Sequence, residues 1–334
     1  MSLANVAKRS KTVIVGYKIY QNWRNRQKLD SGNIETEYGS THSQKSTSDS
    51  VKYIQEQFAD YLEYSNLQPA DLSRKKILEL GSGDNIGVAL KFLAAGAAKV
   101  VCVDRFYSRR DQKQQRDIYK ALRETLSTPE RERFDPVISL TDGFEIDDNR
   151  LKCLYGKALE DIDDELLTGD GPFDLIVSRA VIEEIYDPWP AFQAMDQLLK
   201  PGGLLVHKID LSDYGIFSEH AQHPLTFLTI GESVYRMMAS HSALPNRKRR
   251  EYYRRMMEQL GYHAQLFVTS VIERGAIVPH KLTVEGGVDY NESILERVNE
   301  IKPRLCEEFA HSTDQDLIVN GIFLVARKPA DSIS

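Results

Sequence analysis

The chain is poor in cysteine and has no long apolar stretch. Cys102, Cys153 and Cys306 are the three cysteines among 334 residues, and no two of them are close in sequence. This spacing predicts reduced thiols, with neither a disulfide framework nor a zinc site. Because no apolar run is long enough to span a bilayer and no signal-peptide pattern is apparent, we expect a cytoplasmic protein.

The chain also lacks an excess of positive charge. It has 43 Lys and Arg residues against 49 Asp and Glu residues, a formal net charge of -6, so its overall charge does not favour nucleic acid as a partner. The composition, 41% hydrophobic and 28% charged, is typical of a soluble globular protein. The length suits one large α/β domain with additions or two small domains.

The N-terminal segment has the opposite charge pattern. Seven Lys and Arg residues precede Asp30, the first acidic residue, and apolar and aromatic residues lie between them. Residues 1–30 are therefore interpreted either as a basic amphipathic helix in peripheral contact with an anionic membrane or as a helix packed on the domain. The following residues, 31–50, are rich in Ser, Thr and Gly and predict a polar linker.

A glycine-rich turn follows the first buried strand of the domain. The apolar strand at 76–80 runs directly into Gly81 and Gly83, which allow a sharp turn and a close approach of a ligand to the backbone. A helix follows, and then a second apolar strand ends at Asp104. Strand, glycine turn, helix, strand and acid in this order predict a nucleotide-binding α/β domain in which the acid binds ribose hydroxyls.

The rest of the domain alternates between predicted strands and helices. Helices are expected at 50–65, 87–95, 190–199, 247–260 and 291–309, and strands at 76–80, 99–104, 151–155, 173–178, 204–209, 264–272 and 321–327. The alternation predicts a doubly wound, mostly parallel seven-stranded sheet. We divide the chain into a basic segment with a polar linker, 1–49, and one domain, 50–330, with insertions at 105–150 and 211–245.

The spacing of the glycines distinguishes between nucleotides. Gly81, Gly83 and Gly87 form G-x-G-x-x-x-G, whose third glycine is one place late for the dinucleotide fingerprint. With Glu79, the turn reads E-L-G-S-G-D, which resembles motif I of the class I S-adenosyl-L-methionine (SAM) methyltransferases. Three later stretches resemble further motifs of that family: CLYGKALEDI at 153–162, GPFDLIVSRAVIEEI at 171–185 and LLKPGGLLVHKID at 198–210. The resemblance covers about residues 75–210 and implies a Rossmann-like methyltransferase that uses SAM.

The resemblance also implies which residues hold the cofactor. These are Glu79, Gly81, Ser82, Gly83, Asp104, Arg105, Lys157, Ala158, Ser178 and Arg179. Lys157 departs from the family pattern, because it stands where the family has an acid that binds the adenine amino group. Glu160 and Asp161 are the alternatives for that contact.

The residues that bind and activate the acceptor are expected outside these motifs. We predict catalytic roles for His207, Asp210 and His223, and acceptor binding by Glu183, Asp213 and Arg247. A histidine is suited to remove a proton near neutral pH. A divalent metal held by His220, His223 and a nearby aspartate is an alternative, but the Asp-Asp/Asn ligand pattern of catechol-type enzymes does not stand out, so no metal site is predicted.

The predicted function is methyl transfer to an oxygen atom of a small-molecule or glycan-type acceptor. Methylation of nucleic-acid bases is disfavoured, because 178–181 reads Ser-Arg-Ala-Val where amino-methylating enzymes carry an Asn/Asp-Pro-Pro-aromatic tetrad. One alternative is an RNA- or protein-directed methyltransferase that uses the basic helix at 247–255. Another is a non-catalytic SAM-binding scaffold at a membrane surface.

Overall fold

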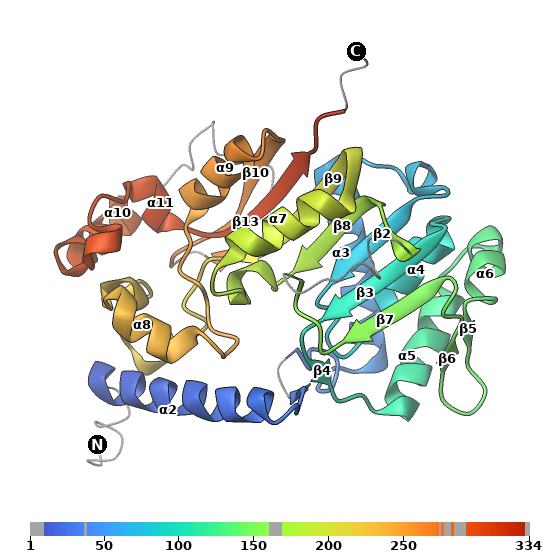
Figure 1. The fold of residues 1–334 in the computed structure, drawn as a ribbon, viewed down its shortest axis with the longest axis horizontal. Coiled ribbons are helices and arrows are strands. Elements are labelled where there is room, and N and C mark those ends of the chain that lie inside the picture. The colour runs from blue at the N-terminus through green and yellow to red at the C-terminus, as the bar shows by residue number, and fades with distance from the viewer. Residues whose placement is uncertain are drawn as a thin grey trace.

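The computed structural model describes residues 10–36, 39–159, 169–273, 275–276, 282–283 and 292–330. One large sheet forms its centre (Figure 1). In spatial order its main strands are β10 (His263–Val271), β13 (Val319–Arg327), β9 (Leu199–Asp210), β8 (Phe173–Arg179), β2 (Lys76–Leu80), β3 (Lys99–Asp104) and β7 (Leu151–Tyr155). Strand β13 runs antiparallel to both of its neighbours, whereas β9, β8, β2, β3 and β7 pair in parallel.

This sheet confirms the predicted mostly parallel α/β fold. Each of the seven expected strands is present, with limits that differ by a few residues. Two short strands, β11 (Gly275–Ala276) and β12 (Leu282–Thr283), add to the outer edge of β10 in antiparallel pairing and bring the sheet to nine strands. Strands of two residues have too little periodicity to be recognised in a sequence.

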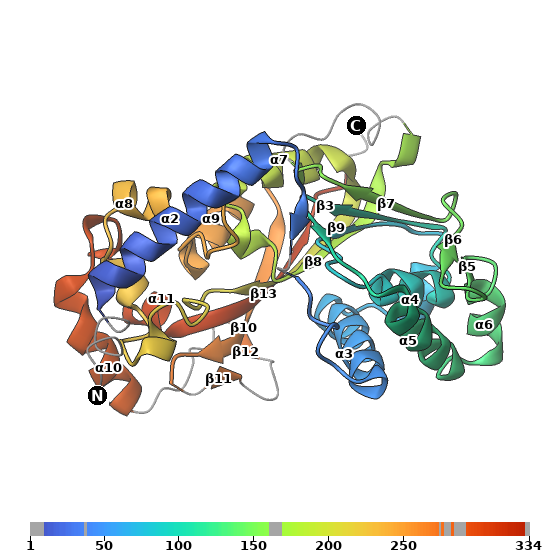
Figure 2. The same ribbon diagram turned by 90° about the horizontal axis from the view of Figure 1, so that it is seen from below.

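Helices cover both faces of the sheet (Figure 2). On one face lie α3 (Thr47–Ser65), α4 (Gly87–Ala95) and α5 (Gln112–Glu124), and on the other lie α7 (Pro188–Leu198) and α9 (Arg250–Gln259). The strands alternate between these two cores, since Ile77 packs with the first group and Leu78 and Leu80 with the second. Burial on both faces explains why the strands read as continuous apolar runs in the sequence.

The segment between β3 and β7 folds as a small subassembly at the edge of the sheet. It contains β4 (Tyr107–Ser108), α5, α6 (Thr128–Phe134), β5 (Ile138–Ser139) and β6 (Glu145–Ile146). Strand β4 pairs in parallel with β1 (Glu35–Thr36), which belongs to the segment predicted as a linker. The linker is thereby joined to the loop that follows the tip of β3.

Helices α8 (Glu232–Ala239), α10 (Glu292–Ile301) and α11 (Asp314–Ile318) lie at the other end of the molecule (Figure 1). Short 3-10 helices occupy 69–72, 182–184, 218–220, 226–229, 302–304 and 307–309. The helix expected at 291–309 is therefore a shorter α10 followed by two 3-10 turns. Pro303, which falls in the first of these turns, lacks the backbone N–H that a continuing helix needs.

The basic N-terminal segment contains a helix, α2 (Lys11–Asp30), that lies beside α8 (Figures 1 and 2). Asn22 is buried between them, and its Nδ2 donates to the Met237 carbonyl at 3.0 Å and to Ser240 Oγ at 3.2 Å. Its Oδ1 accepts the backbone N–H of His241 at 2.7 Å. Among the helices that the structure describes, none combines the length and the apolar character needed to cross a membrane.

Candidate active site

The turn after β2 requires glycine at two positions. Gly81 and Gly83 have φ angles of +68° and +59°, in the left-handed region. A Cβ atom on Gly81 would collide with Cγ2 of Val181, and one on Gly83 would lie 2.7 Å from the Gly39 carbonyl oxygen. A larger residue at Gly81 or Gly83 therefore strains the backbone. It also pushes against Val181 in the first case and against Gly39 in the second.

Asp104 lies beside this turn at the carboxyl end of β3. Its Oδ2 accepts the N–H of Gly83 at 3.2 Å and its Oδ1 accepts that of Phe106 at 3.0 Å. Burial raises the pKa of this carboxyl group, while the two N–H groups and the Arg110 guanidinium act in the opposite direction. A carboxylate can accept about four hydrogen bonds, so Asp104 retains capacity for the hydroxyls of a ribose.

A first cavity of ≈160 Å³ lies above the turn and the tips of the neighbouring strands. It is lined by Leu29, Thr36, Gly39, Leu80, Gly81, Gly83, residues 103–106, Ser108, residues 157–159, 180–181, 184–186 and 240–243. The lining comes from α2, β1, the loops after β3, β7 and β8, and the segment after α8. This cavity occupies the carboxyl edge of the parallel strands, where α/β folds bind their ligands.

Six of the residues expected to hold a cofactor line the first cavity. They are Gly81, Gly83, Asp104, Arg105, Lys157 and Ala158. Ser82, between the two glycines, has a buried hydroxyl with no hydrogen-bond partner among the described residues. A close backbone turn, a carboxylate and an unpaired hydroxyl fit a nucleoside cofactor such as SAM.

Three other expected cofactor residues lie behind the cavity wall. Glu79 is buried under the turn, where burial raises the pKa of its carboxyl group to about 8 and the Cys102 thiol lies 3.6 Å from Oε2. Ser178 Oγ lies 2.8 Å from Nδ1 of His207, and Arg179 forms an ion pair with Asp60 at 2.7 Å. The alternative adenine contacts, Glu160 and Asp161, lie outside the described residues.

The three residues with predicted catalytic roles do not line the first cavity. His207 is fully buried, stands edge-on to the Phe192 ring, and has its pKa lowered to about 3 by burial. Nε2 of His223 lies 2.8 Å from the Arg297 carbonyl oxygen. Asp210 accepts the N–H of Ser212 at 2.8 Å.

The three residues expected to bind the acceptor form internal contacts. Glu183 accepts hydrogen bonds from the Asp210 backbone and the Tyr214 hydroxyl, at 2.9 and 2.8 Å. Asp213 accepts the N–H groups of residues 215, 217 and 218 and so closes the loop after β9. Arg247 is buried against the Tyr235 ring and pairs with Glu232 at 2.6 Å and with Glu308 at 3.1 Å.

Two ionisable residues of the first cavity were not selected from the sequence. Glu184 follows the tip of β8, and burial, with Glu183 and Asp104 nearby, raises its pKa well above the usual value. Glu184 could have been selected from the sequence, because it stands in the 171–185 motif at a position where the family often has a histidine. His241 had no such signal, because packing of α2 on α8 brings it to the cavity from more than 30 residues beyond β9.

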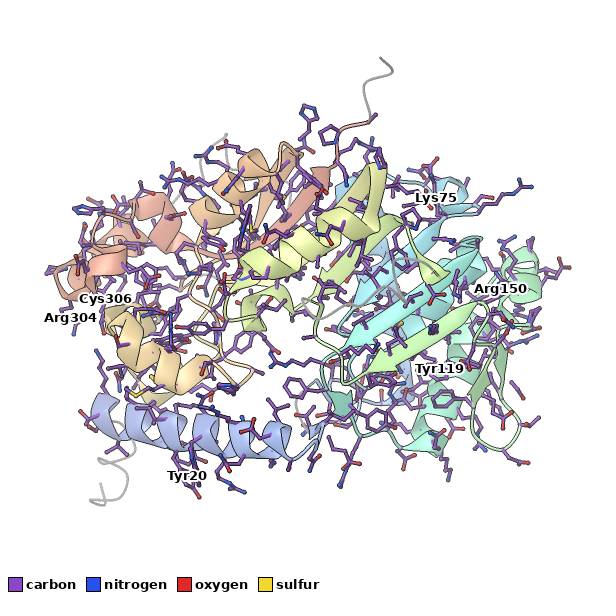
Figure 3. The ribbon with its side chains drawn as sticks, in the orientation of Figure 1. Tyr20, Lys75, Tyr119, Arg150, Arg304 and Cys306 are labelled. Atoms are coloured by element: carbon purple, nitrogen blue, oxygen red, sulfur yellow. The ribbon has the colours of Figure 1, made fainter. Side chains whose placement is uncertain are left out.

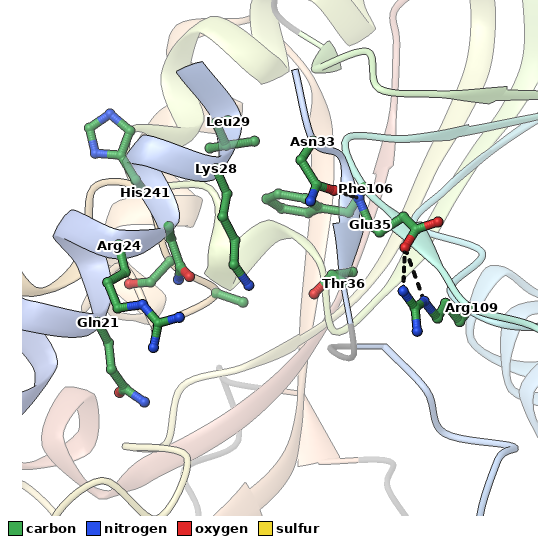
Figure 4. A pocket seen from close by; sticks show the side chains of 13 residues that line it. Gln21, Arg24, Lys28, Leu29, Asn33, Glu35, Thr36, Phe106, Arg109 and His241 are labelled. Atoms are coloured by element: carbon green, nitrogen blue, oxygen red, sulfur yellow. Dashed lines mark hydrogen bonds and ion pairs between the residues drawn. The ribbon is translucent and has the colours of Figure 1, made fainter. Parts of the chain in front are cut away.

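His241 also lines a second cavity, of ≈530 Å³, that adjoins the first (Figure 4). The two cavities share Leu29, Thr36, Phe106, His241, Ser242 and Ala243. The second cavity is further bounded by Gln21, Arg24, Asn25 and Lys28 of α2 and by Asn33, Glu35 and Arg109. Burial lowers the pKa of His241, and Arg26 and Arg105 lower it further, against an opposing effect of Asp30.

Comparison with known proteins gives a match to a family described as methyltransferase domain, over residues 51–265. Among solved structures, phosphoethanolamine N-methyltransferase 2 of Haemonchus contortus is similar with 17% identity and a TM-score of 0.42, covering 86% of this chain. The chain spans 58% of that nematode enzyme. No curated protein matches the chain.

Two further solved structures are similar over most of the chain. A putative sarcosine dimethylglycine methyltransferase from Galdieria sulphuraria has 14% identity and a TM-score of 0.42, with 91% of this chain and 98% of that one covered. An O-methyltransferase family protein from Burkholderia thailandensis has 12% identity and a TM-score of 0.40, with 96% and 73% covered.

Proposed function

Since the chain belongs to the methyltransferase-domain family, we propose that it is a SAM-dependent methyltransferase and that it methylates an oxygen atom of a small-molecule or glycan-type acceptor. The observation that carries this proposal is the position of His241, which lines both cavities. A base at that junction stands between a cofactor in the first cavity and an acceptor in the second. Oxygen acceptors need such a base, because a hydroxyl must lose its proton as the new bond forms.

The proposed cofactor site is the first cavity. SAM, when bound, supplies an electrophilic methyl group carried on a sulfonium. The turn at Gly81 and Gly83 allows a ligand to approach the backbone, Ser82 offers its unpaired hydroxyl, and Asp104 accepts ribose hydroxyls. Lys157 and Ala158 also line this cavity.

The proposed base is the imidazole of His241. Its Nδ1 lies 2.9 Å from Ser240 Oγ, and its backbone N–H is held by Asn22. Because burial and the nearby arginines lower its pKa, the ring is neutral at pH 7 and can accept the acceptor's hydroxyl proton. Burial raises the pKa of Glu184 in the same cavity well above its usual value, which favours the protonated carboxyl group.

The test compares His241→Asn with His263→Asn, a matched variant of an exposed histidine at the start of β10. Phenols, sugars, amines, RNA and protein are offered with SAM, and the methylated atom is identified by mass spectrometry and NMR. We expect oxygen methylation that falls at least about 100-fold in His241→Asn, with unchanged SAM affinity by calorimetry. Methylation of amines, RNA or protein alone would show that the proposal is wrong.

The basic helix at 247–255 gives little support to an RNA-directed enzyme. Arg249 is buried and donates to backbone carbonyls, and Arg250 lies 3.6 Å from Asp316. Arg254 and Arg255 pair with Glu251 on the same helix. To bind RNA, these arginines would have to give up their carboxylate and carbonyl partners in the protein for RNA phosphates.

We also propose that this enzyme is cytoplasmic and makes peripheral contact with an anionic membrane through α2. Four large apolar side chains of this helix are exposed, namely Val13, Tyr17, Tyr20 and Trp23, and Met237 is exposed on the neighbouring α8. Tyr20 points away from the rest of the molecule in Figure 3. The exposed cation Arg26 lies on the same helix, and apolar rings beside a cation suit a negatively charged interface.

Vesicle sedimentation tests the membrane contact. The full chain should sediment with vesicles containing phosphatidylserine more than with pure phosphatidylcholine, and added salt should weaken the binding. Tyr20→Ser/Trp23→Ser should remove most of it, whereas Val234→Ser, at a less exposed apolar residue of α8, should not. Equal sedimentation of the double variant and the wild type would contradict the contact.

A further inference from the structure

The second cavity has more cationic than anionic groups in its wall. Its charged side chains are Arg24, Lys28, Arg109 and Glu35. Glu35 is engaged by Arg109, whose Nε and Nη2 lie 3.0 and 2.8 Å from the same carboxylate oxygen. The two cations of α2 are therefore not balanced by the acid of the cavity.

Arg24 and Lys28 extend from one side of α2 into the same space (Figure 4). They are four residues apart and so lie one turn apart on the helix. Within the described part of the chain, neither has a carboxylate within ion-pair distance; the nearest notable contact is the Tyr20 ring, 6.0 Å from the Arg24 guanidinium carbon. Two adjacent cations that face a cavity without a protein partner are suited to an oxyanion.

The cavity is large enough for a whole acceptor and opens toward the reaction centre. Its volume of ≈530 Å³ lies within the usual range for small-molecule sites, about 300–1,000 Å³. His241, Phe106 and Thr36 belong to the wall that this cavity shares with the first cavity. An acceptor anchored by an anionic group at α2 can therefore present a hydroxyl at His241.

We propose that the second cavity binds the acceptor, and that Arg24 and Lys28 select acceptors with a carboxylate or phosphate group. This inference rests on the proposed function and narrows its acceptor class. It also gives α2 a direct role in specificity. Arg24 supplies a planar fork that can bind two oxygens of the anion, and Lys28 supplies a point charge.

Binding of inorganic phosphate gives a readout that does not depend on turnover. Phosphate is titrated calorimetrically into the full chain saturated with S-adenosylhomocysteine, for the wild type, Arg24→Gln/Lys28→Gln and Lys52→Gln/Arg255→Gln. The last variant removes the same charge at two exposed cations on α3 and α9. We expect at least tenfold weaker phosphate binding in the first double variant and wild-type binding in the control. Equal weakening in both would reduce the effect to net charge and overturn the proposal.

Turnover with matched acceptors provides the second arm. Phenol is compared with 4-hydroxybenzoate, and a sugar with its phosphate. The anionic member of each pair should have the lower KM, and Arg24→Gln/Lys28→Gln should raise that KM at least tenfold while leaving the neutral member unchanged. Equal KM values within each pair, in the wild type and the variant, would overturn this inference but leave oxygen methylation standing. Conversely, intact phosphate binding without any oxygen methylation would refute the proposed function and leave the anion site standing.

Two further measurements identify the source of the anion. If SAM affinity falls tenfold in the Arg24→Gln/Lys28→Gln variant while the phosphate isotherm is unchanged, the two cations hold the cofactor's carboxylate and the proposal is overturned. Phosphate on a lipid is compared with free phosphate by adding vesicles of phosphatidic acid to the turnover assay with the soluble sugar phosphate. If the vesicles inhibit turnover of the sugar phosphate in the wild type but not in Arg24→Gln/Lys28→Gln, the oxyanion site is supported and also binds lipid headgroups. Absence of competition supports a soluble acceptor.

Discussion

His241 shows how the chemistry of one residue depends on its neighbours. Its ring is half-buried next to Ser240, and three charged groups act on it: Arg26 and Asp30 of α2, and Arg105 after β3. Burial and both arginines favour the neutral ring, while Asp30 favours the charged one. As a base, His241 acts in its neutral form, so activity is full above its pKa and is lost as the pH falls through it.

Because Arg26 lowers the pKa of His241, the direction in which Arg26→Gln should shift the pH profile of activity can be predicted. Removal of a cation that lowers the pKa of His241 should shift that pKa upward, toward its ordinary value of 6.5. The acidic limb of kcat/KM should therefore move to higher pH, with the plateau above pH 7 retained. Profiles of the wild type, Arg26→Gln and Arg255→Gln decide the matter, and a limb that stays in place or moves to lower pH in Arg26→Gln speaks against His241 as the base.

Gly81 permits a second prediction at this scale. Gly81→Ala should weaken SAM binding by at least tenfold, because the new methyl group collides with Val181 and the φ of +68° is unfavourable for alanine. Gly202→Ala is the control, since Gly202 has a φ of +76° and open space at its Cβ, far from the cavities. Calorimetric titration with SAM should separate the two variants; equal affinities would mean that the close contact at Gly81 is relieved at little cost.

At the scale of elements, the contact between α2 and α8 joins the N-terminal segment to the candidate site. Asn22 forms three hydrogen bonds there, two as donor to residues of α8 and its C-cap and one as acceptor from His241. These bonds hold the wall that carries His241 next to the side of α2 that carries Arg24 and Lys28. The geometry of both cavities thus depends on a helix outside the central α/β pattern.

Asn22→Ala should loosen this contact. The Met237 carbonyl and the His241 N–H would lose their partner at a partly buried contact, at a cost of about 1 kcal/mol. We expect faster amide hydrogen exchange over residues 232–242 and a raised acceptor KM, with little change in SAM affinity. Gln27→Ala, at an exposed amide of the same helix, should leave exchange and KM as in the wild type. An unchanged exchange pattern in Asn22→Ala would count against the role of this contact.

At the scale of the whole molecule, Arg249 ties distant parts of the chain together. Its buried guanidinium donates to the Leu211 carbonyl at 2.6 Å, after β9, and to the carbonyls of Asp316, Leu317 and Val319, before or at the start of β13. Burial lowers its pKa to about 10, which still leaves it charged at neutral pH. It therefore serves as a structural cation.

Arg249→Met should lower the free energy of unfolding by about 3 kcal/mol or more, because several buried carbonyls lose their donor together. Arg255→Met, at an exposed arginine of α9 with 73% of its side chain accessible, should change it by less than about 0.5 kcal/mol. Urea denaturation measures both. Similar stability of the two variants would mean that water replaces the guanidinium at these carbonyls.

Much of the fold was predictable because it depends on local patterns. Apolar runs and the glycine turn predicted the seven main strands, and the turn residues Gly81 and Gly83 line the first cavity together with Asp104. The histidines were harder to judge. His207 lies within β9 near its carboxyl end, and His223 follows β9 in sequence. His207 is nevertheless fully buried, and His223 bonds to the Arg297 carbonyl. Sequence distance from a strand tip does not say which way a side chain points.

The sequence alone determined the proposed methyl-donor site, because the strand, turn and acid that form it are adjacent or nearly so along the chain. Only the tertiary structure decided the proposed acceptor site. His241, Arg24 and Phe106 come from segments more than 80 residues apart, and the packing of α2 on α8 and the pairing of β1 with β4 bring them to one cavity. Such contacts arise from burial and hydrogen bonding between distant segments, which leave no periodic pattern in the sequence.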